Sequence, residues 1–449
     1  MTENLTEQFT DGLYKLSQQK FSENVINEAK KCLLDYLGVT IVGAEILKNK
    51  STKAIDVMGD LGDIAVVGLG IQSSIQTAIL FNGIHSHVIE LDDGHRVAMM
   101  HPGAPIISAL LPLAQKKNIS GVDFLRAIII GYEAAVRLAS ALQPSLKEKG
   151  FHGTGIAGTV GAAVAIATAL KFTKQQMKDA ISAATTSASG ILKVIKDISE
   201  LKPYNVGNAA KNGYISAMLA LSDFKGPYDT FEGKLGFLSM MSEHCNERFL
   251  HFDKNDDFSI LKIYRKPYAA CRHCHSPIEA ALLLKEKYNL KVEDIKFVHV
   301  KTYFLGVGGH DHTDIVGVNS AKMSTPYSIA VSLVKGKAGL AEFTQEAVND
   351  NQVLVLSKQI TVDADDELTA LVPQKRAAIV SVTTKDGQVA TERVDYPKGE
   401  PENPISDDEL KEKFISLMQF SGKSVEDSKS IIQVIENLEN DFDKLFQYI

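Results

Sequence analysis

Hydrophobic side chains recur with a helical period through the first half of the chain. Between Ser22 and Gly43 apolar residues return every three or four positions, as they do along the buried face of an α-helix. Ser22 stands just before this pattern and predicts its N-cap. The same period predicts helices, joined by short linkers, at residues 6–46, 74–84, 104–116, 121–143, 153–170, 174–191 and 207–222. This half of the chain therefore predicts a compact, all-helical bundle.

Two of these segments, 153–170 and 207–222, are rich in glycine and alanine. Small side chains allow two helix axes to approach closely, so the pair predicts a buried helical hairpin at the centre of the bundle. Neither segment follows a predicted strand, and neither has the glycine spacing of a dinucleotide-binding or phosphate-binding loop. We therefore assign these glycines to packing.

The pattern changes after about residue 255. Residues 295–304 and 377–397 alternate between apolar and polar side chains, and the turn at Lys385–Gly387 predicts a β-hairpin. Helical patterns also occur in this region, at residues 276–289, 324–336 and 342–350. Together they predict an α+β unit.

A proline-rich linker at residues 397–404 precedes charged helical segments that run to the end of the chain. The predicted fold is mainly α with an α+β second domain. Its predicted parts are a helical domain over 1–260, an α+β domain over 261–397, and helices over 398–449 that return to the first domain.

Composition excludes several classes of protein. The chain has 449 residues, 45% of them hydrophobic, and a net charge of −7, which does not favour a nucleic-acid or anionic-membrane partner. Four cysteines are too few for a disulfide scaffold. The N-terminus lacks the features of a secretory signal, and the longest apolar stretch is too short to span a bilayer. These features predict a cytoplasmic protein.

The segment Asn82–Gly103 is the richest in groups that can carry chemistry. Its titratable side chains are His85, His87, Glu90, Asp92, Asp93, His95 and His101. Histidine titrates near neutral pH, and a nearby carboxylate fixes its tautomer and raises its basicity. The segment therefore predicts proton transfer or metal binding, and the alternative is a polar loop whose histidines are all hydrogen-bonded.

Three further polar islands stand in apolar or glycine-rich surroundings. His152 and Lys202 each lie at the start of a small-residue helix, where backbone N–H groups suit a carboxylate ligand. The third island, residues 266–284, contains the charged or titratable residues Lys266, Arg272, His273 and His275. Its Cys271-x-x-Cys274 spacing invites a zinc interpretation, but the nearest complement, His310 and His312, leaves the motif incomplete.

These islands carry a resemblance to a known family. The matching residues, in order, are Asn82-Gly83, His87, Leu91-Asp92-Asp93, His101-Pro102, Phe151-His152-x-Thr154-Gly155, Lys202, Gly207-x-Ala209-Ala210-x-x-Gly213, Glu232-Gly233, Lys266-x-Tyr268, Cys271, His275 and Ser324-x-x-Tyr327. In these motifs the chain, from about residue 6 to residue 440, resembles the MmgE/PrpD family. That family includes 2-methylcitrate dehydratases, cis-aconitate decarboxylases and iminodisuccinate epimerases.

The resemblance implies a large helical domain built from both chain ends, an inserted α+β lid domain, and a homodimer with its active site in the cleft between domains. It also implies chemistry without a metal or an organic cofactor. The pocket residues that it implies are His101, His152, Lys202, His275 and Tyr327, with Asp92 or Asp93 beside them. Gly94, Asn205 and Met323 depart from the common motifs, which leaves the substrate more open than the chemistry.

The function predicted from these residues is a metal-independent lyase, 2-methylcitrate dehydratase-like, acting on a small di- or tricarboxylate. We expect His101, His152 and His275 to share the acid and base roles, with Asp93 orienting one imidazole and Lys202 holding a carboxylate or the leaving group. The predicted substrate-binding residues are Asp92, His87, Lys266, Arg272, Tyr327 and Thr154.

Other activities remain open at this point. A decarboxylase or an epimerase could use the same bases. From other classes, the alternatives are a non-catalytic binding protein and a zinc-dependent hydrolase. The hydrolase would use His85, His87, Asp93, His273 and His275.

Overall fold

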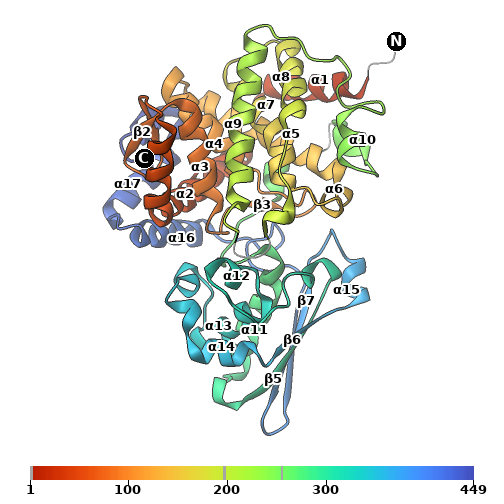
Figure 1. Ribbon diagram of the computed structural model, residues 1–449, viewed down its shortest axis with the longest axis vertical. Coiled ribbons are helices and arrows are strands. Elements are labelled where there is room, and N and C mark those ends of the chain that lie inside the picture. The colour runs from red at the N-terminus through yellow and green to blue at the C-terminus, as the bar shows by residue number, and fades with distance from the viewer. Residues whose placement is uncertain (1–3, 196–198, 254–255) are drawn as a thin grey trace. The chain divides into compact units, whose positions relative to one another are not determined.

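A computed structural model describes residues 4–195, 199–253 and 256–449, and the chain forms two compact units (Figure 1). Unit 1 comprises the described residues of 1–195, 201–263 and 406–449. Unit 2 comprises residues 264–405 together with Ser199 and Glu200. Unit 1 is therefore built from both ends of the chain.

Helices dominate unit 1. They are α1 (Leu5–Ser17), α2 (Glu23–Met58), α3 (Ile75–His87), α4 (Gly103–Lys117), α5 (Gly121–Leu142), α6 (Ser145–Glu148), α7 (Gly153–Ala169), α8 (Lys174–Ser187), α9 (Lys202–Leu221), α10 (Phe237–Met241), α16 (Asp407–Phe420), α17 (Val425–Glu436) and α18 (Leu438–Leu445). Short strands also occur, at β1 (Ile64–Val66), β2 (Ile71–Ser73) and β3 (Gly94–His95), and β4 (Ile263–Tyr264) lies where unit 1 gives way to unit 2. The β1–β2 hairpin is a small departure from the predicted all-helical bundle.

The centre of unit 1 is α7, whose residues are all buried. It packs against α5 and α9, so the predicted close packing of the two small-residue helices is confirmed, but α8 lies between them in the chain and they do not form a hairpin. Their small side chains bring backbones together, and the same holds where α9 meets α3. A Cβ atom on Gly83 would lie 2.5 Å from the Cα atom of Gly207, so α3 and α9 touch backbone to backbone. This contact sets the end of α3 beside the start of α9.

Unit 2 contains a four-stranded sheet with the strand order β6–β5–β7–β8. The strands are β5 (Ile295–Thr302), β6 (Ile360–Ala364), β7 (Ala378–Thr384) and β8 (Val389–Val394). β5 is parallel to β6 and antiparallel to β7, and β7 and β8 form a hairpin.

The helices of unit 2 are α11 (His275–Tyr288), α12 (Val318–Met323), α13 (Thr325–Lys335), α14 (Asn351–Ser357) and α15 (Asp366–Ala370). α11 packs on β7 and β8, and α13 packs on α11, on α14 and on β6 (Figure 1). The sheet and these helices make the α+β fold of the unit.

The fold class predicted from the sequence, mainly α with an α+β part, is confirmed. One local prediction is wrong, because residues 342–350 form two short 3₁₀ turns, Leu340–Phe343 and Ala347–Asn349, and no α-helix. The α-helix begins only afterwards. The side chain of Asp350 accepts hydrogen bonds from the N–H groups of Gln352 and Val353 and so caps α14.

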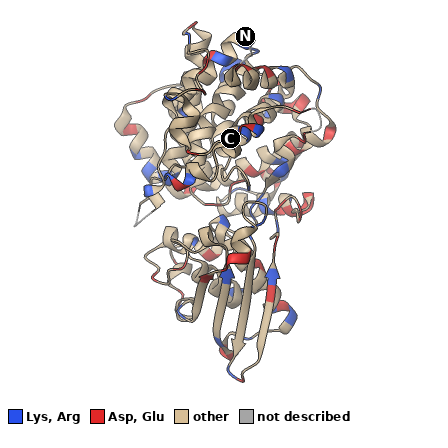
Figure 2. Ribbon diagram, turned by 90° about the vertical axis from the view of Figure 1, so that its right-hand side faces the viewer, with Lys and Arg blue, Asp and Glu red and all other residues tan. Residues whose placement is uncertain are grey.

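No helix within the described parts of the chain is both long and apolar enough to cross a membrane. In the view of Figure 2, acidic and basic residues are interspersed along both units. Binding of a charged substrate would therefore require charged side chains at the site itself. The polar side chains beside the helix ends are the candidates.

Candidate active site

Four helix ends in unit 1 bring the sequence-predicted residues together. His87 ends α3, His101 lies two residues before α4, His152 is the N-cap of α7, and Lys202 begins α9. The ring centroids of His87 and His101 lie 5.0 Å apart, and those of His87 and His152 lie 5.7 Å apart. We call His87, Asp92, His101, His152 and Lys202 the unit 1 cluster.

Hydrogen bonds fix two of the three imidazole rings. Nδ1 of His87 lies 2.7 Å from Oδ2 of Asp92, and Nδ1 of His101 donates to the main-chain oxygen of Asp93 at 2.6 Å. In neutral His101 the lone pair is therefore on Nε2, which can accept a proton. The main-chain N–H of His101 also donates to the hydroxyl of Thr154 at 3.0 Å, so Thr154 joins the two histidine motifs.

The carboxylate of Asp93, unlike that of Asp92, does not bond an imidazole in the described hydrogen bonds. Its carboxylate accepts from the hydroxyl of Tyr132 at 2.6 Å and from the N–H of Gly103 at 3.1 Å. Burial raises the pKa of Asp93 to about 7, the hydrogen bond from Tyr132 opposes the rise, and the nearby carboxylates of Asp35 and Asp92 add to it. Asp93 thus orients His101 through its backbone, while Asp92 is the carboxylate that orients a ring, that of His87.

His152 is held in its neutral form. Burial lowers its pKa well below the usual value, and the charges of His87, Lys202 and His101 lower it further, against a smaller opposing effect of Glu90. The side-chain amide nitrogen of Asn205, which stands where the family often has His, lies 3.4 Å from Nδ1 of His152. A neutral imidazole at neutral pH can accept a proton or donate a hydrogen bond, as acid–base catalysis requires.

Lys202 forms an ion pair with Glu90. Only 15% of the lysine side chain and 7% of the glutamate side chain are exposed. Glu90 has a φ of 56°, in the left-handed region that non-glycine residues seldom adopt, and such strain is commonly held at functional sites. The pair places a nearly buried cation beside the three imidazoles.

The sequence interpretation did not assign a role to Glu90, Tyr132 or Asn205. Glu90 lies inside the segment Asn82–Gly103, whose many titratable residues mark it as a candidate site. Its pairing with Lys202, however, depends on the turn that follows α3. Tyr132 lies in the middle of the apolar helix α5, and no pattern in the sequence marks it.

The predicted site residues of unit 2 lie in the segment that precedes and opens α11. His275 is 1% exposed, and its Nε2 lies 3.2 Å from the main-chain oxygen of Ala270. The ring of Tyr268 meets it edge-on, with 5.3 Å between centroids, and the Tyr268 hydroxyl donates to Glu279 at 2.9 Å. Lys266 is fully buried.

Two other predicted substrate-binding residues have partners inside unit 2. Arg272 forms a buried ion pair with Glu400, and its guanidinium lies 4.8 Å from the ring centre of Tyr264. The hydroxyl of Tyr327 donates to the main-chain oxygens of Glu342 and Ala347 at 2.9 and 3.2 Å. For the Tyr327 hydroxyl to donate to a substrate, it would have to give up these partners.

Of the five ligands of the zinc-hydrolase alternative, three lie in unit 1 and two, His273 and His275, lie in unit 2. His85 hydrogen-bonds the hydroxyl of Ser51 at 2.8 Å, and burial lowers its pKa to about 3. Among the described residues, the histidine, cysteine and carboxylate groupings close enough for a metal have other members: His87, Asp92 and His101 in unit 1, and Cys271, His273 and His310 in unit 2.

In the first grouping, Asp92 already bonds His87, and Nδ1 of His101 bonds a main-chain oxygen. This is the arrangement of an oriented acid–base pair.

Comparison with known proteins covers almost the whole chain. Residues 7–249 match the MmgE/PrpD N-terminal domain, and residues 268–440 match the MmgE/PrpD C-terminal domain. The chain is 28% identical to the cis-aconitate decarboxylase-like protein oryM of Aspergillus oryzae, over 97% of this chain and 93% of that protein.

The chain is also 27% identical to a cis-aconitate decarboxylase of Aspergillus terreus, over 96% of this chain and 91% of that protein. It is 25% identical to the cis-aconitate decarboxylase of Homo sapiens, over 98% of this chain and 93% of that protein. Because both family domains match, in order and over most of its length, the chain belongs to the MmgE/PrpD family.

Proposed function

We propose that this protein is a lyase that acts on a small di- or tricarboxylate by moving a proton at a carbon next to a carboxylate. The observation that carries the proposal is the unit 1 cluster, in which two oriented imidazoles, one neutral imidazole and one nearly buried lysine lie together at helix ends. The full-length similarity to cis-aconitate decarboxylases supports it.

Lys202 is the proposed anchor for a substrate carboxylate. It already holds a carboxylate, that of Glu90, so a substrate can take the same place on the ammonium group. α7 and α9 begin at this cluster, and the N–H groups of a helix's first turn favour an anion. Together they supply the positive potential that the overall charge of −7 does not.

The histidines are the proposed proton carriers. A proton next to a carboxylate is weakly acidic, so its removal or return needs a positioned base or acid and a cation that stabilises the enolate-like charge. His101 can exchange the proton through Nε2, and neutral His152 can act as the second group. Asp92 keeps His87 oriented beside them.

Decarboxylation of cis-aconitate is the proposed reaction, because relatives that match over nearly their whole length are named cis-aconitate decarboxylases. The carbon–carbon bond to one carboxylate breaks and releases carbon dioxide. Its electron pair forms a new double bond, the old double bond shifts its electrons to the carbon next to another carboxylate, and that carbon takes a proton. His101, protonated on Nε2, would give this proton, and Lys202 would stabilise the intermediate charge.

Dehydration of 2-methylcitrate, the reaction expected from the sequence, is the second candidate. It needs the same base next to a carboxylate, plus an acid for the departing hydroxyl. Asn205, at 3.4 Å from His152, stands where the family often has a histidine. Asparagine in place of histidine changes the group beside His152, a proposed acid or base, and is compatible with a different substrate.

Proton NMR of the purified protein in deuterated buffer would test the proposal. The substrates are cis-aconitate, 2-methylcitrate, citrate and iminodisuccinate, each with and without a chelator. Conversion of cis-aconitate to a product with a new terminal alkene and one incorporated deuteron would support the decarboxylase. Loss of 2-methylcitrate to an alkene would support the dehydratase instead, and exchange without net product would indicate an epimerase. No reaction with any of the four would contradict these assignments.

The other expectations remain predictions. They are the roles of His275, Lys266, Arg272 and Tyr327 in substrate binding, a homodimer, a cytoplasmic location, and the absence of a cofactor, a nucleic-acid partner and a membrane partner.

A further inference from the structure

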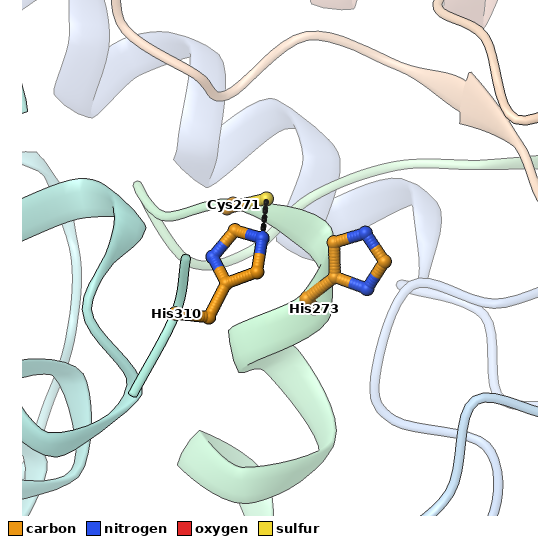
Figure 3. A group of neighbouring side chains, drawn as sticks. All are labelled: Cys271, His273 and His310. Carbon is orange, nitrogen blue, oxygen red and sulfur yellow. Dashed lines mark hydrogen bonds between the residues drawn. The ribbon is translucent and has the colours of Figure 1, made fainter. Parts of the chain in front are cut away.

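A second group of chemically capable side chains lies in unit 2 (Figure 3). Cys271 precedes the 3₁₀ turn Arg272–Cys274, His273 lies within that turn, and His310 lies on the loop that runs between β5 and α12. Each offers one ligand atom, and these atoms all lie within 4.8 Å of one another. Sγ of Cys271 is 4.0 Å from Nε2 of His310. We call these three residues the unit 2 cluster.

In both imidazoles of the unit 2 cluster, Nδ1 forms a hydrogen bond to a group outside the cluster. Nδ1 of His310 donates to the main-chain oxygen of Met323 at 2.7 Å, and Nδ1 of His273 bonds the hydroxyl of Tyr303 at 2.7 Å. A hydrogen bond at one ring nitrogen that fixes the other toward the metal is the usual arrangement around metal-binding histidines. Tyr303 is 1% exposed and His310 is 7% exposed, so this support lies inside the fold.

A second sulfur lies next to the group. Cys274 is fully buried, and its Sγ accepts a hydrogen bond from the hydroxyl of Thr325 at 3.5 Å. Cys274 ends the same 3₁₀ turn, Arg272–Cys274, that carries His273. Cys274 is therefore a fourth candidate ligand, close to but outside the tight group of three.

We propose that Cys271, His273 and His310 bind a thiophilic divalent metal ion, zinc first, with Cys274 or water completing a tetrahedral site. Bonds of about 2.0 Å to nitrogen and about 2.3 Å to sulfur put tetrahedral nitrogen and sulfur ligands about 3.5 Å apart. The 4.0 Å separation of Cys271 and His310 therefore needs to shorten only slightly. The site shares no residue with the unit 1 cluster, and no step of the proposed lyase reaction passes through it.

The consequence for the protein is local order. The metal would join the 3₁₀ turn Arg272–Cys274 to the loop of His310, two segments that are far apart in sequence. His275 follows this turn directly and begins α11, so the metal would position the segment that carries it. The proposed metal ion has a structural role. The experiment that tests it therefore measures metal binding and not turnover.

The test is metal binding by the full-length protein. The protein is stripped with a chelator, dialysed against Zn²⁺, and its metal content measured by mass spectrometry; Co²⁺ is then substituted for Zn²⁺ and the absorption spectrum recorded. We expect one metal per chain, with the thiolate-to-cobalt charge-transfer band and the visible bands of a tetrahedral site. Cys271→Ser should remove both the metal and the charge-transfer band, and His310→Gln should remove the metal. Tyr303→Phe, which deletes only the supporting hydrogen bond, should weaken binding about tenfold.

Three control variants separate this site from other thiols and histidines. Cys245→Ser changes a cysteine of unit 1, His299→Gln changes a half-buried histidine of unit 2, and His101→Gln changes the unit 1 cluster. All three should keep the metal. Wild-type protein that binds no more metal than Cys271→Ser would overturn the proposal, as would loss of the metal in His101→Gln with retention in Cys271→Ser. Circular dichroism of the stripped proteins checks that each variant is folded, and Cys271→Ala serves if the serine variant is not.

Discussion

The unit 1 cluster and the unit 2 cluster contain the same kind of side chain but differ in what holds it. In unit 1 the Nδ1 atom of His87 bonds Asp92, a member of its own cluster. In unit 2 the Nδ1 atoms of His273 and His310 bond a tyrosine hydroxyl and a main-chain oxygen outside the cluster. His101 of unit 1 is held by a main-chain oxygen as His310 is, so the contact that distinguishes the two clusters is the carboxylate of Asp92 on His87, which suits proton transfer.

The charges around the two clusters differ in sign. In unit 1 burial and the positive charges of neighbouring groups, Lys202 among them, lower the pKa of His152. In unit 2 burial also acts to lower the pKa of His310, but Cys271 and Cys274 outweigh it and raise that pKa well above the usual value. A histidine beside a lysine stays neutral and can serve an anionic substrate, whereas a histidine beside two thiols is favoured in its charged form and must release that proton when it binds a metal.

The largest expected effect tests whether the unit 1 cluster is catalytic. His101→Gln and His152→Gln should each lower turnover about 10²- to 10⁴-fold, because each removes a proposed proton carrier. The NMR assay measures it, with His299→Gln as a control that should keep full turnover. Unchanged turnover in a folded His101→Gln protein would show that His101 is not a proton carrier and would contradict a catalytic role for the unit 1 cluster.

The next effect concerns Asp93, whose pKa is raised by burial to about 7. The unfolded chain loses this proton near pH 4 and the folded protein only near pH 7, so the stability that the protonated group contributes is lost as pH rises between them. Between about pH 5 and about pH 8 the loss is about 2–3 kcal/mol. The Asp93→Asn variant should not show this loss of stability with rising pH. Urea unfolding of both proteins at the two pH values measures the difference, and parallel pH slopes would contradict the assignment.

A smaller effect tests the backbone contact that places the unit 1 cluster. Gly83→Ala would put a methyl group against Gly207, and overpacking of this kind costs about 1–3 kcal/mol. Turnover should fall with stability, because the end of α3 and the start of α9 would move apart. Gly308→Ala is the matched control, since nothing lies within 4 Å of its added carbon. Equal unfolding free energies for the two variants would show that the helices can separate without cost.

The smallest effect is a shift of pH dependence. Lys202→Met removes the proposed carboxylate anchor and therefore lowers turnover; it also removes a positive neighbour that lowers the pKa of His152, so the acid limb of the remaining kcat/KM profile should move to higher pH. Glu90→Gln removes a neighbour that raises this pKa, so it should move the limb to lower pH. Shifts in the same direction would show that His152 does not control the limb.

Short-range signals explain which parts of the fold could be predicted. The helical period over α2 to α9 and the alternation over β5, β7 and β8 are local patterns, and they gave the correct fold class. The strand β6 and the 3₁₀ turns at 340–349 were missed. β6 pairs with β5, a strand distant in sequence, and the turns depend on caps such as the side chain of Asp350.

The sequence by itself determined the family and the residues that meet in the unit 1 cluster, because its motifs lie at the ends of helices whose periods are visible in the chain. The tertiary structure alone decided that Asp92 orients His87 while Asp93 bonds Tyr132, and that Glu90 pairs with Lys202. It also decided that Cys271 and His273 meet His310, which lies 39 residues after Cys271 in the sequence. The physical reason is that helical period and capping act over a few residues, whereas these contacts depend on close packing of segments tens of residues apart.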